Sequence, residues 1–171
     1  MTQTMEIEMI ANVKQPLARF AFAMVLMMST LPIWAQDTMT EAKAVAAYPL
    51  TMDHVAREFQ ASTDMPSGRA INELPLEDRI KRLDATPKAA AVLKVHGLSS
   101  RDFVMTGAAV GAAIIVAGLL DSGEKGPGPG AANQIQWAAA PPEHIKFYRD
   151  HKAEIDKLVA QMTQAILNRK N

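Results

Sequence analysis

An uninterrupted apolar run in the middle of the chain constrains its fold more than any other feature. Residues 103–120 (FVMTGAAVGAAIIVAGLL) contain no charged side chain and a single polar one, Thr106. Counted from Ser100, a helix through this run is about 31 Å long at ~1.5 Å per residue, which matches the hydrocarbon core of a bilayer. The run is therefore predicted to be either the central helix of a soluble bundle or a membrane span. We favour the central helix, because glycines disfavour a helix and alanines contribute little to membrane insertion.

Glycines recur on one side of this expected helix. Gly107, Gly111, Ile114 and Gly118 follow one another at spacings of four, three and four residues, so they share a face. Gly107-x-x-x-Gly111 is also the small-residue pattern of closely packed membrane helices. Gly107, Gly111 and Gly118 are therefore predicted to form a helix-packing face.

The first 35 residues have the pattern of an export signal. Basic residues Lys14 and Arg19 precede the apolar run 20–28 (FAFAMVLMM), and residues 31–35 (LPIWA) end in a small residue. We predict a cleaved signal peptide over residues 1–35, cleavage after Ala35, and a periplasmic mature protein.

Three further observations bear on export. Glu6 and Glu8 are unusual in a basic signal region, so initiation at Met9 would give a more typical signal. An uncleaved anchor is the alternative, but about 10 apolar residues fall short of the roughly 20 that span a bilayer. The chain has no cysteine, which excludes a lipoprotein anchor, disulfides and c-type haem attachment.

The charge balance limits the partners. The chain has 18 basic and 18 acidic residues, and the predicted signal contains two of each. The mature protein is thus neutral and offers no basic surface for nucleic acid.

Apolar spacing and turn residues predict an all-α fold, a small bundle of four to five helices that begins after the signal peptide. Thr51, Thr86 and Ser99 are predicted N-caps, and Gly97 is the predicted end of a helix over residues 87–96. The expected layout is an extended lead-in over 36–50, a helical core over 51–120, a Gly/Pro-rich linker over 121–134 and a C-terminal segment over 135–171. We expect that last segment to contain one long helix starting at Pro141-Pro142.

Four segments resemble a group of bacterial exported helical proteins of unknown function. They are residues 48–55 (YPLTMDHV), 82–87 (RLDATP), 97–104 (GLSSRDFV) and 147–158. The resemblance covers about two-thirds of the mature chain. It implies a periplasmic, all-helical protein and carries no activity or functional residue.

Histidines are the best candidates for a metal or haem site. His144 and His151 lie seven residues apart on one expected helix face, and His54 and His96 would complete a site only if the fold brought them close. Tight sites usually use closer ligand pairs, so we predict structural histidines and no cofactor. A haem held by methionine and histidine is a weaker alternative, because methionine is an ordinary core residue.

Motifs for catalysis are missing. Ser99 and Asp102 suggest a hydrolase, but a capping box explains both, and no nucleophile elbow, zinc-protease motif or phosphate loop occurs. We therefore predict a non-enzymatic interaction or envelope-associated module with an unidentified protein partner. Membrane tethering through a span at 103–120 is the alternative, and a periplasmic haem or metal carrier is a weaker one.

Overall fold

The computed structural model describes residues 35–65, 74–128 and 130–168, and within this part the protein is all-helical with no strand. The predicted all-α class is confirmed, but the described residues form eight helices where four to five were expected. The predicted signal peptide lies outside the described residues, except that Ala35 begins the first described helix. The helices are α2 (Ala35–Ala46), α3 (Met52–Asp64), α4 (Leu76–Asp84), α5 (Pro87–Val95), α6 (Ser100–Asp121), α7 (Ala131–Ala139), α8 (Pro142–Asp150) and α9 (Lys152–Asn168).

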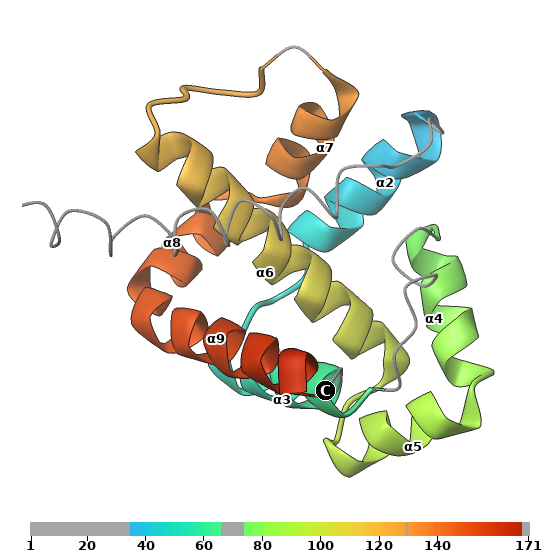
Figure 1. Ribbon diagram of the computed structural model, residues 1–171. Helices are drawn as coiled ribbons and strands as arrows, with labels where there is room; N and C mark the ends of the chain where they lie inside the picture. The colour runs from blue at the N-terminus through green and yellow to red at the C-terminus, as the bar shows by residue number, and fades with distance from the viewer. Residues whose placement is uncertain (1–34, 66–73, 129, 169–171) are drawn as a thin grey trace, which may run out of the picture. The chain divides into compact units, whose positions relative to one another are not determined.

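Helix α6 is the centre of the arrangement (Figure 1). It contacts α2, α3, α4, α5, α7 and α8, while α9 packs on α3 and α2 packs on α7. The core consists of two clusters that meet at this helix. In the first, Ala109 and Val116 of α6 pack with residues of α2, α4, α5 and α7. In the second, Val110 and Ala113 pack with residues of α3, α8 and α9. The run is apolar on two sides because each of them faces a core cluster.

Among the described helices, α6 is the one long and apolar enough to cross a bilayer, and half of its apolar stretch is buried within the protein. A core helix passes the same test of length and composition. The packing of α6 on two sides fits the expected central helix. Its length and composition alone also fit a membrane span.

The predicted extended lead-in is wrong over most of its length, since α2 covers Ala35–Ala46. Alanine has the highest helix propensity, and this segment is rich in it. Packing supplies the rest, because Ala42 and Val45 are buried in the first cluster. Only the residues after the helix, up to Thr51, form a connection.

The C-terminal segment also differs from expectation. The predicted linker is non-helical over its described residues from Ser122 to Gly130, but its last residues belong to helix α7, which begins at Ala131. The expected single long helix is broken at His151 into α8 and α9. The break lets α8 lie on α6 while α9 lies on α3. As a result Tyr148 and Ile155, on opposite sides of the break, are buried in the same cluster. Pro142 is the first residue of α8, as predicted.

Most predicted helix boundaries are confirmed. The hydroxyls of Thr51 and Ser99 accept hydrogen bonds from backbone N–H groups in the first turns of α3 and α6. Gly97 ends the turn after α5 with a φ of 64°, where a side chain would be strained. Thr86 precedes α5 but does not cap it, because its hydroxyl donates to the carbonyl of Arg82 at 2.7 Å.

The three glycines of the predicted face, Gly107, Gly111 and Gly118, have different surroundings. A Cβ on Gly107 would lie 3.1 Å from Oε1 of Glu58 on α3, so α3 does approach closely there. A Cβ on Gly111 or Gly118 would meet nothing within 4 Å among the described residues. The residues that α6 contributes to the two core clusters lie on its other sides. The C-terminal part of the glycine face is therefore left open.

Candidate functional site

Tyr48 lies at the centre of a network of polar side chains. It stands in the connection between α2 and α3, and its hydroxyl donates to Oδ1 of Asp102 at 3.0 Å. Thr106, one turn further along α6, donates to the same hydroxyl at 3.4 Å. Nδ1 of His54 on α3 lies 3.2 Å from the hydroxyl. The network thus joins the start of α3 to the first two turns of α6.

The carboxylate of Asp102 is held by two hydroxyls. Besides Tyr48, Ser99 donates to Oδ2 at 2.6 Å, and the backbone N–H of Asp102 donates back to the Ser99 hydroxyl at 3.0 Å. The hydrogen bond from Ser99 is the main reason that the pKa of Asp102 lies below its usual value, and Tyr48 adds to it. Burial raises the pKa of Tyr48. At neutral pH the pair is therefore a neutral phenol donating to a carboxylate.

His144 holds the other end of Tyr48. The His144 side chain is buried, and its Nε2 lies 2.8 Å from the backbone carbonyl oxygen of Tyr48. A carbonyl only accepts hydrogen bonds, so Nε2 carries a proton. Nδ1 is buried and has no partner among the described residues. Helix α8 is thereby fastened to the connection that precedes α3.

A second buried polar group, Glu58, lies between α3 and α6. Its side chain is 8% exposed and accepts a hydrogen bond of 2.8 Å from the hydroxyl of Ser62, one turn along the same helix. Burial raises the pKa of Glu58 to about 7, and the hydrogen bond from Ser62 offsets this only in part. Glu58 is therefore the described carboxyl whose protonation changes near neutral pH.

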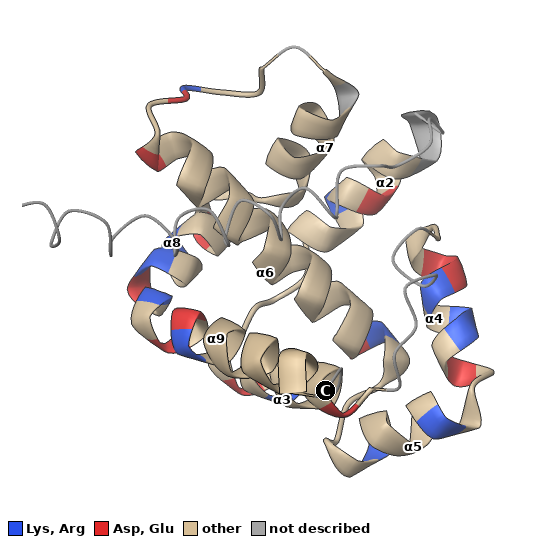
Figure 2. Ribbon diagram, viewed as in Figure 1, with Lys and Arg blue, Asp and Glu red and all other residues tan. Residues whose placement is uncertain are grey.

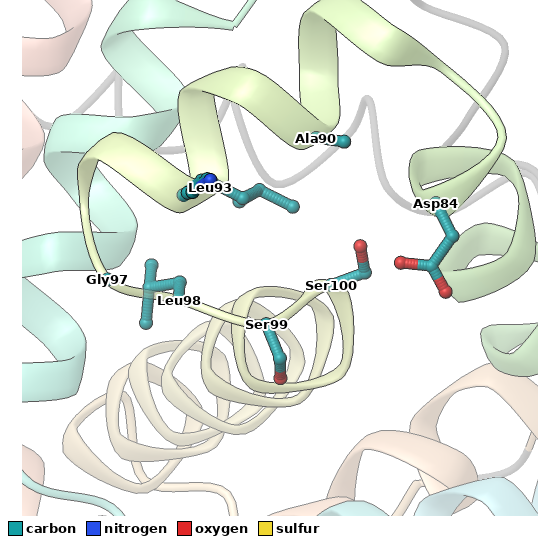
Figure 3. Close-up of a pocket in the computed structure, with 8 residues that line it drawn as sticks. Asp84, Ala90, Leu93, Gly97, Leu98, Ser99 and Ser100 are labelled. Carbon is teal, nitrogen blue, oxygen red and sulfur yellow. The ribbon is translucent and has the colours of Figure 1, made fainter.

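A surface depression of about 450 Å³ lies where α5 meets the start of α6 (Figure 3). The side chains of Asp84 and Ser100 point toward one another across it, and Ser99 points away. Leucine and alanine side chains supply apolar lining, and Asp84 and Lys94 contribute opposite charges. The lining residues are Asp84, Ala90, Leu93, Lys94, Gly97, Leu98, Ser99 and Ser100.

The four histidines singled out by sequence have been placed by the structure in separate contacts. No group of three or more potential metal ligands occurs in the part of the chain that the structure describes. His151 packs against the ring of Phe147, with 4.8 Å between ring centroids. His96 pairs with Asp64 at 2.9 Å. His54 and His144 both reach Tyr48, but at its hydroxyl and its backbone carbonyl respectively.

Sequence reasoning missed two residues of these sites. Tyr48 was assigned to an extended lead-in, and no spacing rule connects it to Asp102, 54 residues later. Glu58 had a visible signal, because it lies between Val55 and Phe59 on the apolar stripe of residues 51–65. A lone carboxylate on such a stripe predicts either a buried acid or an interrupted face.

The comparisons with known proteins do not add to this geometry. No protein family model matches the chain, and neither the curated proteins nor the solved structures gave a match. The function must therefore be inferred from the fold and from the side chains themselves.

Proposed function

We propose that this chain is an exported, non-enzymatic interaction module of the periplasm, and that it binds an apolar helix of a protein partner. The flank of α6 defined by Gly111, Ile115, Gly118 and Leu119 carries the proposal. We call it the open flank, because Gly118 is exposed and the other three residues are only partly buried. Ile115 and Leu119 belong to neither core cluster, and the two glycines face nothing described within 4 Å. These four residues lie within about 100° of one another around the helix at 3.6 residues per turn.

The uncharged surroundings of this flank favour an apolar helix as its occupant. Charged residues gather on α4, α8 and α9, whereas α7 and the C-terminal half of α6 carry none before Asp121 (Figure 2). A partner need not desolvate any charge to reach the flank. Small residues at Gly111 and Gly118 let the backbone of a second helix approach closely, with Ile115 and Leu119 supplying apolar contact. The neutral surface offers no electrostatic attraction to nucleic acid.

The polar side chains support a binding role over catalysis. Asp102, Tyr48 and Ser99 are engaged with one another in hydrogen bonds that fasten helices, and His144 is held by a backbone carbonyl. Each of these contacts has a structural explanation, and none of them leaves an activated nucleophile beside a general base.

Photocrosslinking tests the proposal. A crosslinkable residue replaces Ile115 in the full chain expressed in its host, and the matched control replaces Lys81, which is exposed on α4. We expect a discrete adduct from position 115, mapped to an apolar helical segment of one protein and lost on adding Gly118→Arg, with no such adduct from position 81. Adducts with lipid alone, or none at position 115, would contradict the proposal.

Membrane tethering through α6 is the second candidate, favoured by the 22-residue length and apolar composition of this helix. Alkaline carbonate separates the two. Carbonate should release a soluble module, whereas a protein spanning the bilayer through residues 103–120 stays in the membrane pellet. The packing of α6 against six other helices supports release.

A further inference from the structure

Glu58 is a buried carboxyl with too few partners for a charge. It lies on the side of α3 that faces α6, next to Phe59 of the second core cluster. Of its two oxygens, Oε1 accepts one hydrogen bond, from Ser62, and also lies 3.1 Å from the point where a Cβ on Gly107 would be. An ionised carboxylate has about four acceptor sites, so most of them would be unsatisfied here. A protonated carboxyl suits this position better.

No cation compensates the carboxyl within the described residues. Helix α3 packs against α9, α6 and α5. Among the described residues, burial raises the pKa of Glu58 and the hydrogen bond from the Ser62 hydroxyl lowers it. The charged groups of these helices are paired with one another or exposed to solvent. The pairs are Arg57 with Asp53, His96 with Asp64, Arg101 with Glu77, Arg149 with Asp121, and Lys152 with Asp156. Asp102 accepts from Ser99 and Tyr48, His54 lies at the Tyr48 hydroxyl, and Lys88, Lys94, Glu154 and Lys157 are exposed.

The carboxyl also lies at the contact between α3 and α6. Val55 and Phe59 of α3 share the second cluster with Val110 and Ala113 of α6, and α9 packs on α3. Displacing this part of α3 from Gly107 would expose the Glu58 carboxyl to water. Helix α9 would move with α3, because it depends on the same cluster through Ile155.

We propose that Glu58 is a proton-dependent latch that keeps α3 and α9 seated on α6. The neutral carboxyl keeps the contact at Gly107 closed. The ionised carboxylate requires hydration, so it favours states in which α3 is displaced and the apolar residues of the second cluster are open to solvent. This device is independent of the open flank of α6, which lies on the C-terminal half of the helix.

Hydrogen exchange on the full chain tests the latch. The change is Glu58→Gln, which keeps the shape and the Ser62 partner but cannot ionise, and the control is Glu124→Gln, an exposed acid in the loop after α6. After correction for intrinsic exchange rates, protection of α3 and α9 in the native protein should fall about 10-fold between pH 6 and pH 8, following proton linkage for a group with a pKa near 7. The Glu124→Gln protein should show the same fall, and the Glu58→Gln protein should show none.

Direct titration covers the case in which Glu58→Gln fails to fold. In the unmodified protein, the carboxyl carbon of Glu58 and the amide of Gly107 should titrate together in nuclear magnetic resonance spectra, with a midpoint well above the ordinary glutamate value. A midpoint near 4.5 would overturn the proposal. So would an equal fall in protection in the Glu58→Gln protein, or unchanged protection of α3 in the native protein across this range.

Discussion

The hydroxyl of Tyr48 donates a hydrogen bond of 3.0 Å to Oδ1 of Asp102, joining the connection before α3 to the first turn of α6 across 54 residues of sequence. Thr106 donates to the same hydroxyl, and His144 holds the backbone carbonyl of Tyr48. One residue outside any helix thus connects α3, α6 and α8. The Tyr48 network should therefore contribute to the free energy of unfolding, and its contribution should be lost in acid.

Tyr48→Phe should lower the free energy of unfolding by about 1–2 kcal/mol, because Asp102 loses a charge-assisted hydrogen bond and Thr106 loses its acceptor. The chain offers a matched control in its second tyrosine, Tyr148, whose hydroxyl donates a long hydrogen bond of 3.4 Å to Asp156 and interacts with Lys152. Tyr148→Phe should cost less than about 0.5 kcal/mol. Urea unfolding at pH 7 measures both, and equal losses would show that the Tyr48 network contributes nothing specific.

Stability should be greatest between about pH 4 and 5, because two carboxyls respond to pH in opposite directions. The pKa of Asp102 is lower in the folded protein than in the unfolded chain. Its ionised carboxylate therefore stabilises the fold at pH values above the unfolded pKa, and this stabilisation is lost as the pH falls through the folded pKa. The pKa of Glu58 is raised to about 7, so the folded protein keeps a proton that the unfolded chain releases, and stability falls as pH rises from 4.5 to 7.

The Glu58 effect should amount to about 3 kcal/mol, from ~1.4 kcal/mol for each unit of pKa difference. Urea unfolding of the native protein from pH 3 to pH 8 measures both limbs. Glu58→Gln should flatten the fall toward neutral pH, and Asp102→Asn should weaken the fall toward acid. A native protein whose stability rises steadily from pH 5 to pH 7 would contradict the assignment for Glu58.

Glycine substitutions in α6 should separate the one close contact from the open flank. Gly111→Ala and Gly118→Ala meet nothing described within 4 Å, so each should stabilise the protein by about 1 kcal/mol through helix propensity. Gly107→Ala gains the same propensity but places a methyl group 3.1 Å from Oε1 of Glu58. Its net gain should be smaller or reversed, and thermal unfolding of the three variants measures the order. Equal gains at all three positions would show that Glu58 yields without cost.

The local signals of the sequence predicted much of the fold. Helices begin after Thr51 and Ser99, which cap them with side-chain hydrogen bonds, and at Pro142, whose φ is fixed. The turn after α5 ends at Gly97, which has a positive φ. All of these signals depend on neighbouring residues only. The prediction failed where packing decides the outcome. Helix α2 is stabilised by contact with α7, and the chain breaks at His151 so that α8 and α9 can reach different partners.

The candidate site was harder to predict, for the same reason. The Ser99 hydroxyl and Asp102 were recognised as a local capping arrangement, but Tyr48 reaches Asp102 only through the tertiary fold. The glycine pattern of α6 indicated which residues share a face but not whether a helix lies there, and only Gly107 has a close neighbour among the described residues.

We predict that the protein binds neither a metal ion nor haem, and binding measurements test this. The purified protein should be colourless, and added zinc or haem should bind no more tightly to it than to a His54→Ala, His151→Ala double variant. These two histidines are chosen because neither is buried, so the variant should fold. Isothermal titration and absorption spectra make the comparison. A stoichiometric Soret band, or zinc binding that the double variant loses, would favour the carrier hypothesis.

Export makes the last prediction, and it rests on the basic, apolar and small residues that end at Ala35. Intact mass analysis of the protein released from the periplasm should give an N-terminus at Gln36 or within two residues of it. Ala35→Gln should block cleavage, because the signal then lacks a small residue at the cleavage point, and the uncleaved protein should accumulate on the membrane. Ala46→Gln, at the end of α2, is the matched control and should be processed normally. Recovery of a mature protein that still carries residues 9–35 would instead indicate an N-terminal anchor.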